Sequence, residues 1–253
     1  MLTIIYRLYQ FFIVLPLGLL LTGVMCILIS VFSMIGFPSF AARTFGPFWA
    51  WAMVRMLFLP VHVEGLERLD RRQSYVFVAN HQGAFDIFGI YGFLPHEFKW
   101  MMKKSLEKIP FVGFACRKAG FIFVDKSSRH AIVKTMRDAK QALTGGASLC
   151  VFPEGARTFT GHMGIFRRGA FQLADTLQLP IVPITIDGSF DILPRMKGFN
   201  FVTYHPLRII VHDPIVPTCK GADNVKRCME ESYAAIMSGL PERHQGTVEN
   251  PDQ

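Results

Sequence analysis

Apolar side chains dominate the first sixty residues. No charged residue lies between Arg7 and Arg43, and the apolar stretch that follows carries only Arg55. A helix needs roughly 20 apolar residues to cross the hydrocarbon core of a bilayer. The pattern therefore predicts two hydrophobic helices, at about 9–40 and 45–59.

These helices either span a membrane or lie within one leaflet, bending at Pro16 or at the Gly36-Phe37-Pro38 turn. A cleavable signal peptide is the rival interpretation. Its apolar core is normally about 7–15 residues long and is followed by a cleavage site with small residues. The apolar region here is longer and no such site follows Phe37, so we expect a retained membrane anchor.

From Glu64 onward, short apolar runs alternate with amphipathic segments, which is typical of a mixed α/β sheet flanked by helices. The expected strands are 75–79, 98–102, 121–124, 148–152, 181–186, 200–204 and 208–212, and the expected helices are 129–143, 167–177 and 222–238. We predict a hydrophobic helical membrane anchor at 1–60, an α/β domain at 61–241 and a polar C-terminal tail at 242–253, which we expect to fray.

Charge narrows the possible partners. The net charge is +8, mean hydropathy is +0.30, and the first acidic residue is Glu64. A basic body behind an apolar anchor suits an anionic bilayer or anionic substrates. No nucleic-acid-binding module is recognisable. The five cysteines form no C-x-x-C pair, which favours reduced thiols in a domain that faces the cytoplasm.

A histidine and a carboxylate follow the first predicted strand. His81 and Asp86 lie where the apolar run 75–79 breaks into a loop and a helix, with the small residues Gly83 and Ala84 between them. A lone loop histidine is most often inert. A carboxylate that holds one ring nitrogen, however, leaves the other nitrogen free to act as a base.

A second polar loop, Pro153–Thr158, follows the apolar run 148–152 and contains Arg157. Arginine binds phosphate oxygens in a fork. No G-x-S-x-G motif or activated cysteine supplies a nucleophile. The nucleophile is then a substrate hydroxyl that attacks an activated acyl group such as a thioester.

These motifs resemble the signature blocks of the glycerolphosphate acyltransferase superfamily, and most closely those of the bacterial 1-acylglycerol-3-phosphate acyltransferases. The resemblance covers most of residues 75–186. The blocks are His81-x4-Asp86, Gly120–Lys126, Phe152–Arg157 and Ile181–Ile184, with a lysine-bearing segment, Lys103–Leu106, between the first two. The H-x4-D motif alone is weak evidence for this family, whereas four blocks in the right order are specific evidence.

The resemblance implies a lysophosphatidate acceptor, an acyl-CoA or acyl-carrier-protein donor, no metal or other cofactor, and a place at the bacterial inner (cytoplasmic) membrane. It implies that His81 is the general base and Asp86 its partner. Arg157 holds the glycerol phosphate, and Glu154 and Gly155 shape the acceptor loop. The other expected substrate-binding residues are Lys103, Phe123, Lys126 and Pro183.

Two residues depart from the family pattern. Lys126 stands where arginine is usual and Ala156 where threonine is usual. Lysine keeps the charge but loses the planar fork, and the segment at Asp125 and Lys126 could equally be a structural turn. Lys103 could likewise lie at a solvated edge.

Alternatives to phosphatidic acid synthesis stay open at this point. The acceptor could be glycerol 3-phosphate, a lyso-ornithine lipid or another lysolipid. The chain could instead be a non-catalytic lipid-binding membrane protein, or a hydrolase of thioesters or lipids.

Overall fold

The computed structural model describes residues 1–125, 127–144, 146–196 and 198–249. Its main element is a seven-stranded sheet in the order β1-β8-β7-β2-β5-β3-β4, with β7 and β8 antiparallel and the other neighbours parallel. This confirms the predicted mixed α/β sheet. The strands are β1 (Val61–Glu64), β2 (Val76–Ala79), β3 (Phe98–Lys103), β4 (Ile122–Val124), β5 (Ser148–Val151), β7 (Ile181–Asp187) and β8 (Leu207–Val211).

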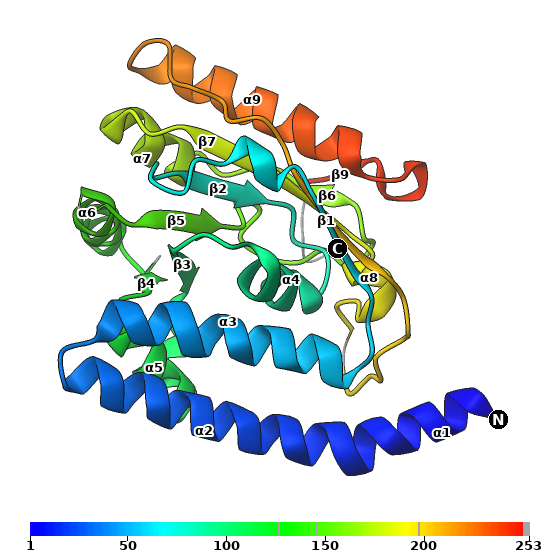
Figure 1. Cartoon of the computed structure of the whole chain (residues 1–253). Helices are drawn as coiled ribbons and strands as arrows, with labels where there is room; N and C mark the ends of the chain where they lie inside the picture. Colours follow the sequence, from blue (N-terminus) through cyan, green and yellow to red (C-terminus); the bar gives the residue numbers. More distant parts are fainter. Residues whose placement is uncertain (126, 145, 197, 250–253) are drawn as a thin grey trace.

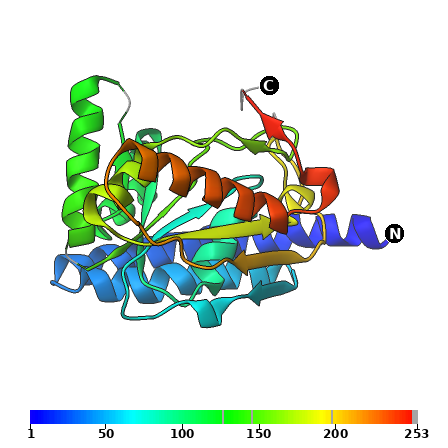
Figure 2. The ribbon, with the colours of Figure 1, turned by 90° about the horizontal axis from the view of Figure 1, so that it is seen from above.

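Helices cover both faces of the sheet because its central strands are buried on both sides. One face packs on α4 (Phe85–Phe93), which lies between the sheet and α3 (Pro38–Met56) (Figure 1). The opposite face is covered by α6 (Arg129–Thr144), α7 (Gly169–Leu177) and α9 (Ala222–Gly239). Seen from above, α9 runs roughly along β7 (Figure 2). The short helix α5 (Val112–Lys118) packs against α2, and α8 (Ser189–Ile192) packs against α4.

The apolar N-terminus forms two helices with boundaries that differ from those expected. One continuous helix consists of α1 (Leu2–Tyr9), a π-helical turn (Gln10–Val14) and α2 (Leu15–Met34). Pro16 is accommodated just after the π turn, and the chain reverses at Gly36, whose φ is 99°.

Among the described residues, Leu2–Met34 alone is long and apolar enough to cross a membrane. The predicted pair of hydrophobic helices therefore provides one such helix, because α3 carries Arg43 and Arg55 and packs a buried side on α4.

Two parts of the sequence-based prediction were wrong. Residues 200–204 form no strand; the backbone N–H and C=O of Val202 bond instead to the side chain of Gln10, each at 2.8 Å. The expected fraying of the tail does not hold for residues 242–249. There His244 is buried, and β9 (Thr247–Val248) pairs with β6 (Met163–Gly164).

Candidate active site

The polar motifs gather at the carboxyl ends of neighbouring parallel strands, where open α/β sheets commonly bind ligands. Because β2 pairs with β5, the segments that follow them, from Asn80 and from Phe152, emerge side by side. Asn80 is fully buried and joins the end of β2 to β7: its side chain donates to the Ile186 carbonyl and accepts from the Ile186 amide, both at 2.8 Å. The start of the 80–86 loop is thereby fixed to the sheet.

His81 and Asp86 are in direct contact. The His81 Nδ1 atom lies 2.7 Å from Asp86 Oδ2, and the Asp86 side chain is fully buried in the first turn of α4. The same oxygen accepts hydrogen bonds from the amides of Gln82 and Gly83, at 2.8 and 2.9 Å. With Nδ1 as the donor to this carboxylate, Nε2 of His81 is left as the basic nitrogen.

The 80–86 loop approaches the segment at Ser189 closely at Gly83, where only glycine fits. A Cβ on Gly83 would lie 2.2 Å from the carbonyl oxygen of Ser189 at the start of α8. Gly83 also forms a bridge with Pro194. The small residue lets the 80–86 loop fold against the end of β7 and bring His81 back to Asp86.

The Phe152 ring stacks against the imidazole of His81. The two rings stack with centroids 4.0 Å apart and planes 11° apart, and the Trp100 ring stacks with Phe152 with its centroid 5.6 Å away. No role for Phe152 was evident from the sequence, because an aromatic residue after a buried strand is usually core. The stack and the Asp86 bond together restrict both the plane and the rotation of the His81 ring.

Glu154 connects the two loops through their backbones. Its Oε1 accepts from the His81 amide at 2.6 Å and its Oε2 from the Gly164 amide at 2.7 Å. The residue is only 2% exposed. Burial raises the pKa of Glu154 to about 8, the two amide hydrogen bonds oppose this rise, and the Asp86 charge adds to it. Glu154 therefore positions the His81 backbone and is too deeply buried to contact a bound substrate.

Arginines surround the loop that follows Glu154. Gly155 has φ of 77°, a conformation that favours glycine. The Arg167 Nε donates to the Glu154 carbonyl at 3.3 Å, and the Arg195 Nη1 donates to the Arg157 carbonyl at 2.6 Å. The Arg195 guanidinium also lies over the ring of Phe159 at 4.2 Å. Arg157 itself is half-buried. Arg195 was not singled out from the sequence because it lies 38 residues from Arg157.

The remaining predicted residues occupy the neighbouring strands. Lys103 is exposed at the end of β3, and Phe123 is half-buried in β4 opposite Met102. Pro183 is buried in β7 opposite Val78, so it contributes to the packing behind the site. Lys126 lies outside the described residues.

The Asp125 side chain accepts a hydrogen bond from the Ser127 amide at 2.9 Å. Hydrogen bonds from Ser127 and then from Lys104 lower the pKa of Asp125 to about 2. The Lys104 ammonium is 3.1 Å from the carboxylate. Asp125 thus binds Lys104, and the turn that the sequence suggested through Lys126 lies outside the described residues.

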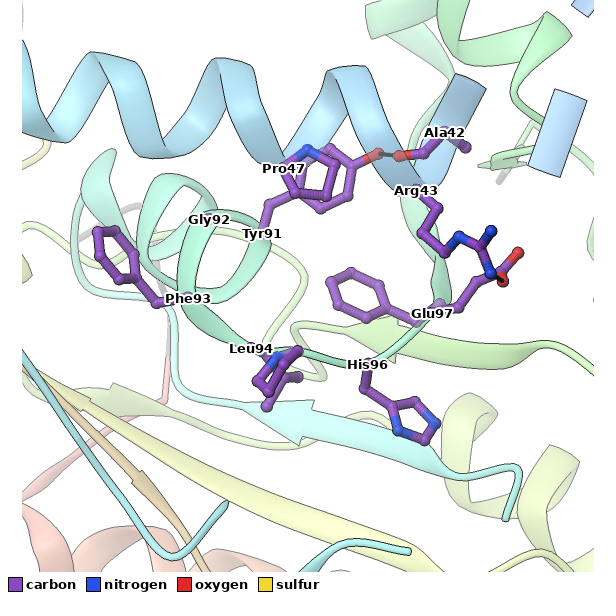
Figure 3. Close-up of a pocket in the computed structure, with 11 residues that line it drawn as sticks. Ala42, Arg43, Pro47, Tyr91, Gly92, Phe93, Leu94, His96 and Glu97 are labelled. Atoms are coloured by element: carbon purple, nitrogen blue, oxygen red, sulfur yellow. Dashed lines mark hydrogen bonds and ion pairs between the residues drawn. The ribbon is translucent and has the colours of Figure 1, made fainter. Parts of the chain in front are cut away.

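A pocket of about 340 Å³ lies between α3 and the end of α4, where Tyr91, Arg43 and Glu97 contribute to its walls (Figure 3). The Tyr91 hydroxyl donates to the Ala42 carbonyl at 2.7 Å, and Arg43 pairs with Glu97 at 3.9 Å. Asp86 is at the other end of α4, roughly 8–10 Å away along the helix at 1.5 Å per residue. This pocket is therefore separate from the His81 site.

One group in the described part of the chain has the spacing of metal ligands: Asp187, Asp191 and His244. Arg243 already donates to Asp191 at 2.9 Å, and its positive charge opposes a cation at that carboxylate.

Comparison with known proteins gives a consistent result. The Acyltransferase family model matches residues 60–187. The chain is 32% identical over 167 residues to the chloroplastic 1-acyl-sn-glycerol-3-phosphate acyltransferase LPAT1 of Arabidopsis thaliana, covering 65% of this chain and 46% of that protein. It is 34% identical over 152 residues to the 1-acyl-sn-glycerol-3-phosphate acyltransferase of Saccharomyces cerevisiae, covering 58% and 50%.

The chain thus spans about half the length of the curated relatives it matches. A solved structure matches over more of the chain. It is the 1-acyl-sn-glycerophosphate (LPA) acyltransferase PlsC from Thermotoga maritima, with a TM-score of 0.67 and 25% identity, and the match covers 90% of this chain and 96% of that one.

Proposed function

The chain belongs to the Acyltransferase family, and we propose that it is a 1-acylglycerol-3-phosphate O-acyltransferase of phospholipid biosynthesis. It transfers an acyl chain from acyl-CoA or acyl-carrier protein to the sn-2 hydroxyl of lysophosphatidate, giving phosphatidic acid. The observation that carries this proposal is the His81–Asp86 pair at 2.7 Å, beside a loop that contains Arg157 and whose backbone carbonyls bind Arg167 and Arg195.

The reaction needs one base and no covalent enzyme intermediate. Nε2 of His81 takes the proton of the acceptor hydroxyl as the oxygen attacks the thioester carbonyl carbon. Asp86 stabilises the imidazolium that forms. The tetrahedral intermediate then expels the thiolate, which takes the proton from His81. The products are the new ester and the free thiol, and His81 is again neutral.

The acceptor phosphate is placed at the 155–157 loop. Arg157 belongs to this loop, while Arg167 and Arg195 hold its carbonyl groups. Clustered guanidinium groups favour an anionic headgroup over a neutral one. On this basis lysophosphatidate is preferred to uncharged lysolipids. The chemistry requires no metal or other cofactor.

One assay tests the activity. The purified chain in detergent is given lysophosphatidate with a panel of acyl-CoA and acyl-carrier-protein donors, and parallel reactions contain glycerol 3-phosphate, a lyso-ornithine lipid or no acceptor. We expect phosphatidic acid with the native chain and a loss of about 10²–10⁴ in rate with His81→Ala. Full activity of His81→Ala would refute the mechanism, free fatty acid without transfer would indicate a hydrolase, and acceptor binding without turnover would indicate a lipid-binding protein.

We also propose that the N-terminal helix holds the protein in one leaflet. Its first part is tied to the end of α3 by Tyr6 and Tyr9, whose hydroxyls donate to the carbonyls of Leu57 and Met56 at 2.8 Å. The Gln10 side chain ties it to the α/β domain through the backbone of Val202. Farther along, Trp49 on α3 donates to Thr22 at 2.9 Å. A helix that crossed the bilayer away from the domain would lose these bonds.

Leu19 and Leu20, which are 67% and 64% exposed, provide the test of this anchor. Replacing both with glutamate should release the chain from membranes without lowering its thermal stability, and retention at the membrane would contradict the proposal.

The location we propose is the cytoplasmic face of the bacterial inner membrane, which agrees with the five unpaired cysteines. Cys219 is exposed and reports on this orientation. A membrane-impermeant thiol reagent should label it in lysed cells and not in intact ones. Labelling in intact cells would place the domain outside.

A further inference from the structure

A second exposed apolar surface lies in the α/β domain, outside the N-terminal helix. We call it the 106–114 patch: Leu106, Ile109, Phe111 and Phe114, which are 38%, 43%, 73% and 44% exposed. It occupies the connection from β3 to α5, including the first residues of α5. Contiguous exposed apolar side chains on a soluble domain usually mark an interaction surface.

The patch is held in place by a tightly built loop. The amide of Val112 donates to the Pro110 carbonyl at 2.7 Å, and Phe111 has φ of 62° and ψ of −51°, which makes a γ-turn with Phe111 at its apex. This turn is rare and strained for a residue with a side chain. A Cβ on Gly113 would lie 2.1 Å from the Glu107 carbonyl oxygen. The loop thus presents a large aromatic ring to solvent from an unfavourable backbone conformation.

Basic residues surround the patch. The segment 103–118 contains Lys103, Lys104, Lys108, Arg117 and Lys118 but a single acidic residue, Glu107. Glu107 is paired with Arg117 at 3.1 Å. The Lys118 ammonium lies over the Phe114 ring at 5.4 Å, at the border between the apolar and charged parts. An apolar centre with a cationic rim is complementary to the surface of an anionic leaflet.

The patch continues the apolar surface of the N-terminal helix. Helix α5 packs against α2 and lies beside it, on the side of the sheet that carries α3 and α4 (Figure 1). Exposed side chains of α2, such as Ile27 at 57% and Val31 at 47%, add to the same apolar exposure. The patch also begins at the carboxyl end of β3, one strand from β5. It therefore lies at the edge of the sheet where the candidate active site opens.

We propose that the 106–114 patch is a membrane-docking surface of the α/β domain that inserts Phe111 into an anionic lipid leaflet. It rests on the membrane association in the proposed function, and it adds a second point of attachment beside the site. Two attachments fix the rotation of the domain about the N-terminal helix, so that the ends of β2, β3 and β5 face the lipid.

Insertion is tested with a fluorophore at position 111. Phe111→Cys is made in the full chain with Cys219→Ser and labelled with an environment-sensitive dye. The chain with native Cys219, which precedes α9 on the opposite face of the sheet, is labelled as the control. Cys26, Cys150 and Cys228 are buried, and burial raises the pKa of Cys116 to about 12, which keeps it a poorly reactive thiol.

In anionic vesicles that carry a lipid-borne quencher, we expect strong quenching at position 111 and little at 219. Quenching at 111 should decrease in vesicles of neutral lipid. Equal quenching at the two positions would overturn the proposal.

A pair of substitutions separates docking from folding. Phe111→Asn removes the exposed ring and keeps a polar side chain at the same backbone position. It should leave the melting temperature nearly unchanged while lowering the partition coefficient into anionic vesicles about tenfold, the effect of withdrawing one large apolar side chain from lipid. Val216→Asn, at a site 61% exposed in the segment before α9, is the matched control.

Equal partition of the Phe111→Asn and Val216→Asn chains would refute the docking surface. Neither measurement requires turnover. A native chain that transfers no acyl group would refute the proposed function and leave the docking result standing. An active chain whose dye at position 111 is not quenched would refute the docking surface and leave the proposed function standing.

Discussion

Replacing Glu154 with glutamine tests whether this residue positions His81 or binds the acceptor. The carboxylate accepts one hydrogen bond on each oxygen, from the amides of His81 and Gly164. A glutamine side chain can accept only one of them, and its NH₂ group would face the other amide as a second donor. One buried N–H then loses its partner.

The expected magnitudes follow from that geometry. An unsatisfied buried donor costs about 1–3 kcal/mol, so the free energy of unfolding should fall by about that amount. If the lost bond lets the His81 backbone move by about 1 Å, the misplacement should lower kcat by about 10²-fold. The acceptor KM should stay within about twofold, because the 2% exposed Glu154 side chain is not in reach of a bound lipid.

The assay combines denaturant unfolding with steady-state kinetics at varied lysophosphatidate, both at a pH above 8, where Glu154 with its pKa of about 8 is a carboxylate. Glu67→Gln, at an exposed glutamate, is the matched control and should change neither quantity. A Glu154→Gln chain with a raised acceptor KM and an unchanged kcat would refute this reasoning, because it would mean that Glu154 touches the substrate.

Three further predictions concern the same loops. Asp86→Asn should lower kcat by about 10²–10⁴ with an unchanged melting temperature, since the fully buried side chain no longer offers His81 a charged acceptor; near-native kinetics would argue against the base–orienter pair. Gly83→Ala should lower both stability and kcat, because its Cβ would lie 2.2 Å from the Ser189 carbonyl oxygen, while Gly169→Ala, with nothing within 4 Å, should be neutral in melting and turnover measurements. Burial raises the pKa of Glu154 to about 8, above the value of about 4.3 for an unfolded glutamate. The contribution of this group to stability is therefore complete below the unfolded pKa and is lost as the pH rises through about 8. Unfolding curves between these limits should show native stability falling relative to Glu154→Gln, and parallel pH profiles would contradict the assignment.

Much of the fold follows from local pattern. The buried strands β2, β5 and β7 are runs of apolar residues that end at polar motifs, and these were predicted within one or two residues. Strand β1 was missed because its residues alternate between half-buried and exposed and include His62 and Glu64. The segment 200–204 has a strand-like composition, but its backbone is held by Gln10, 192 residues away, and no local pattern encodes that contact.

The contacts of the candidate site also fall into local ones, which the sequence predicts, and long-range ones, which it does not. The sequence by itself determined the placement of His81 and Asp86, because both belong to one short strand–loop–helix unit whose geometry depends on neighbouring residues. It also identified the Pro153–Thr158 loop as its basic counterpart. Only the tertiary structure decided that Phe152 stacks on His81, that Glu154 bonds to the His81 backbone, and that Arg195 holds the Arg157 carbonyl. These contacts depend on the order of strands in the sheet, and that order is set by packing between segments that are far apart in the chain.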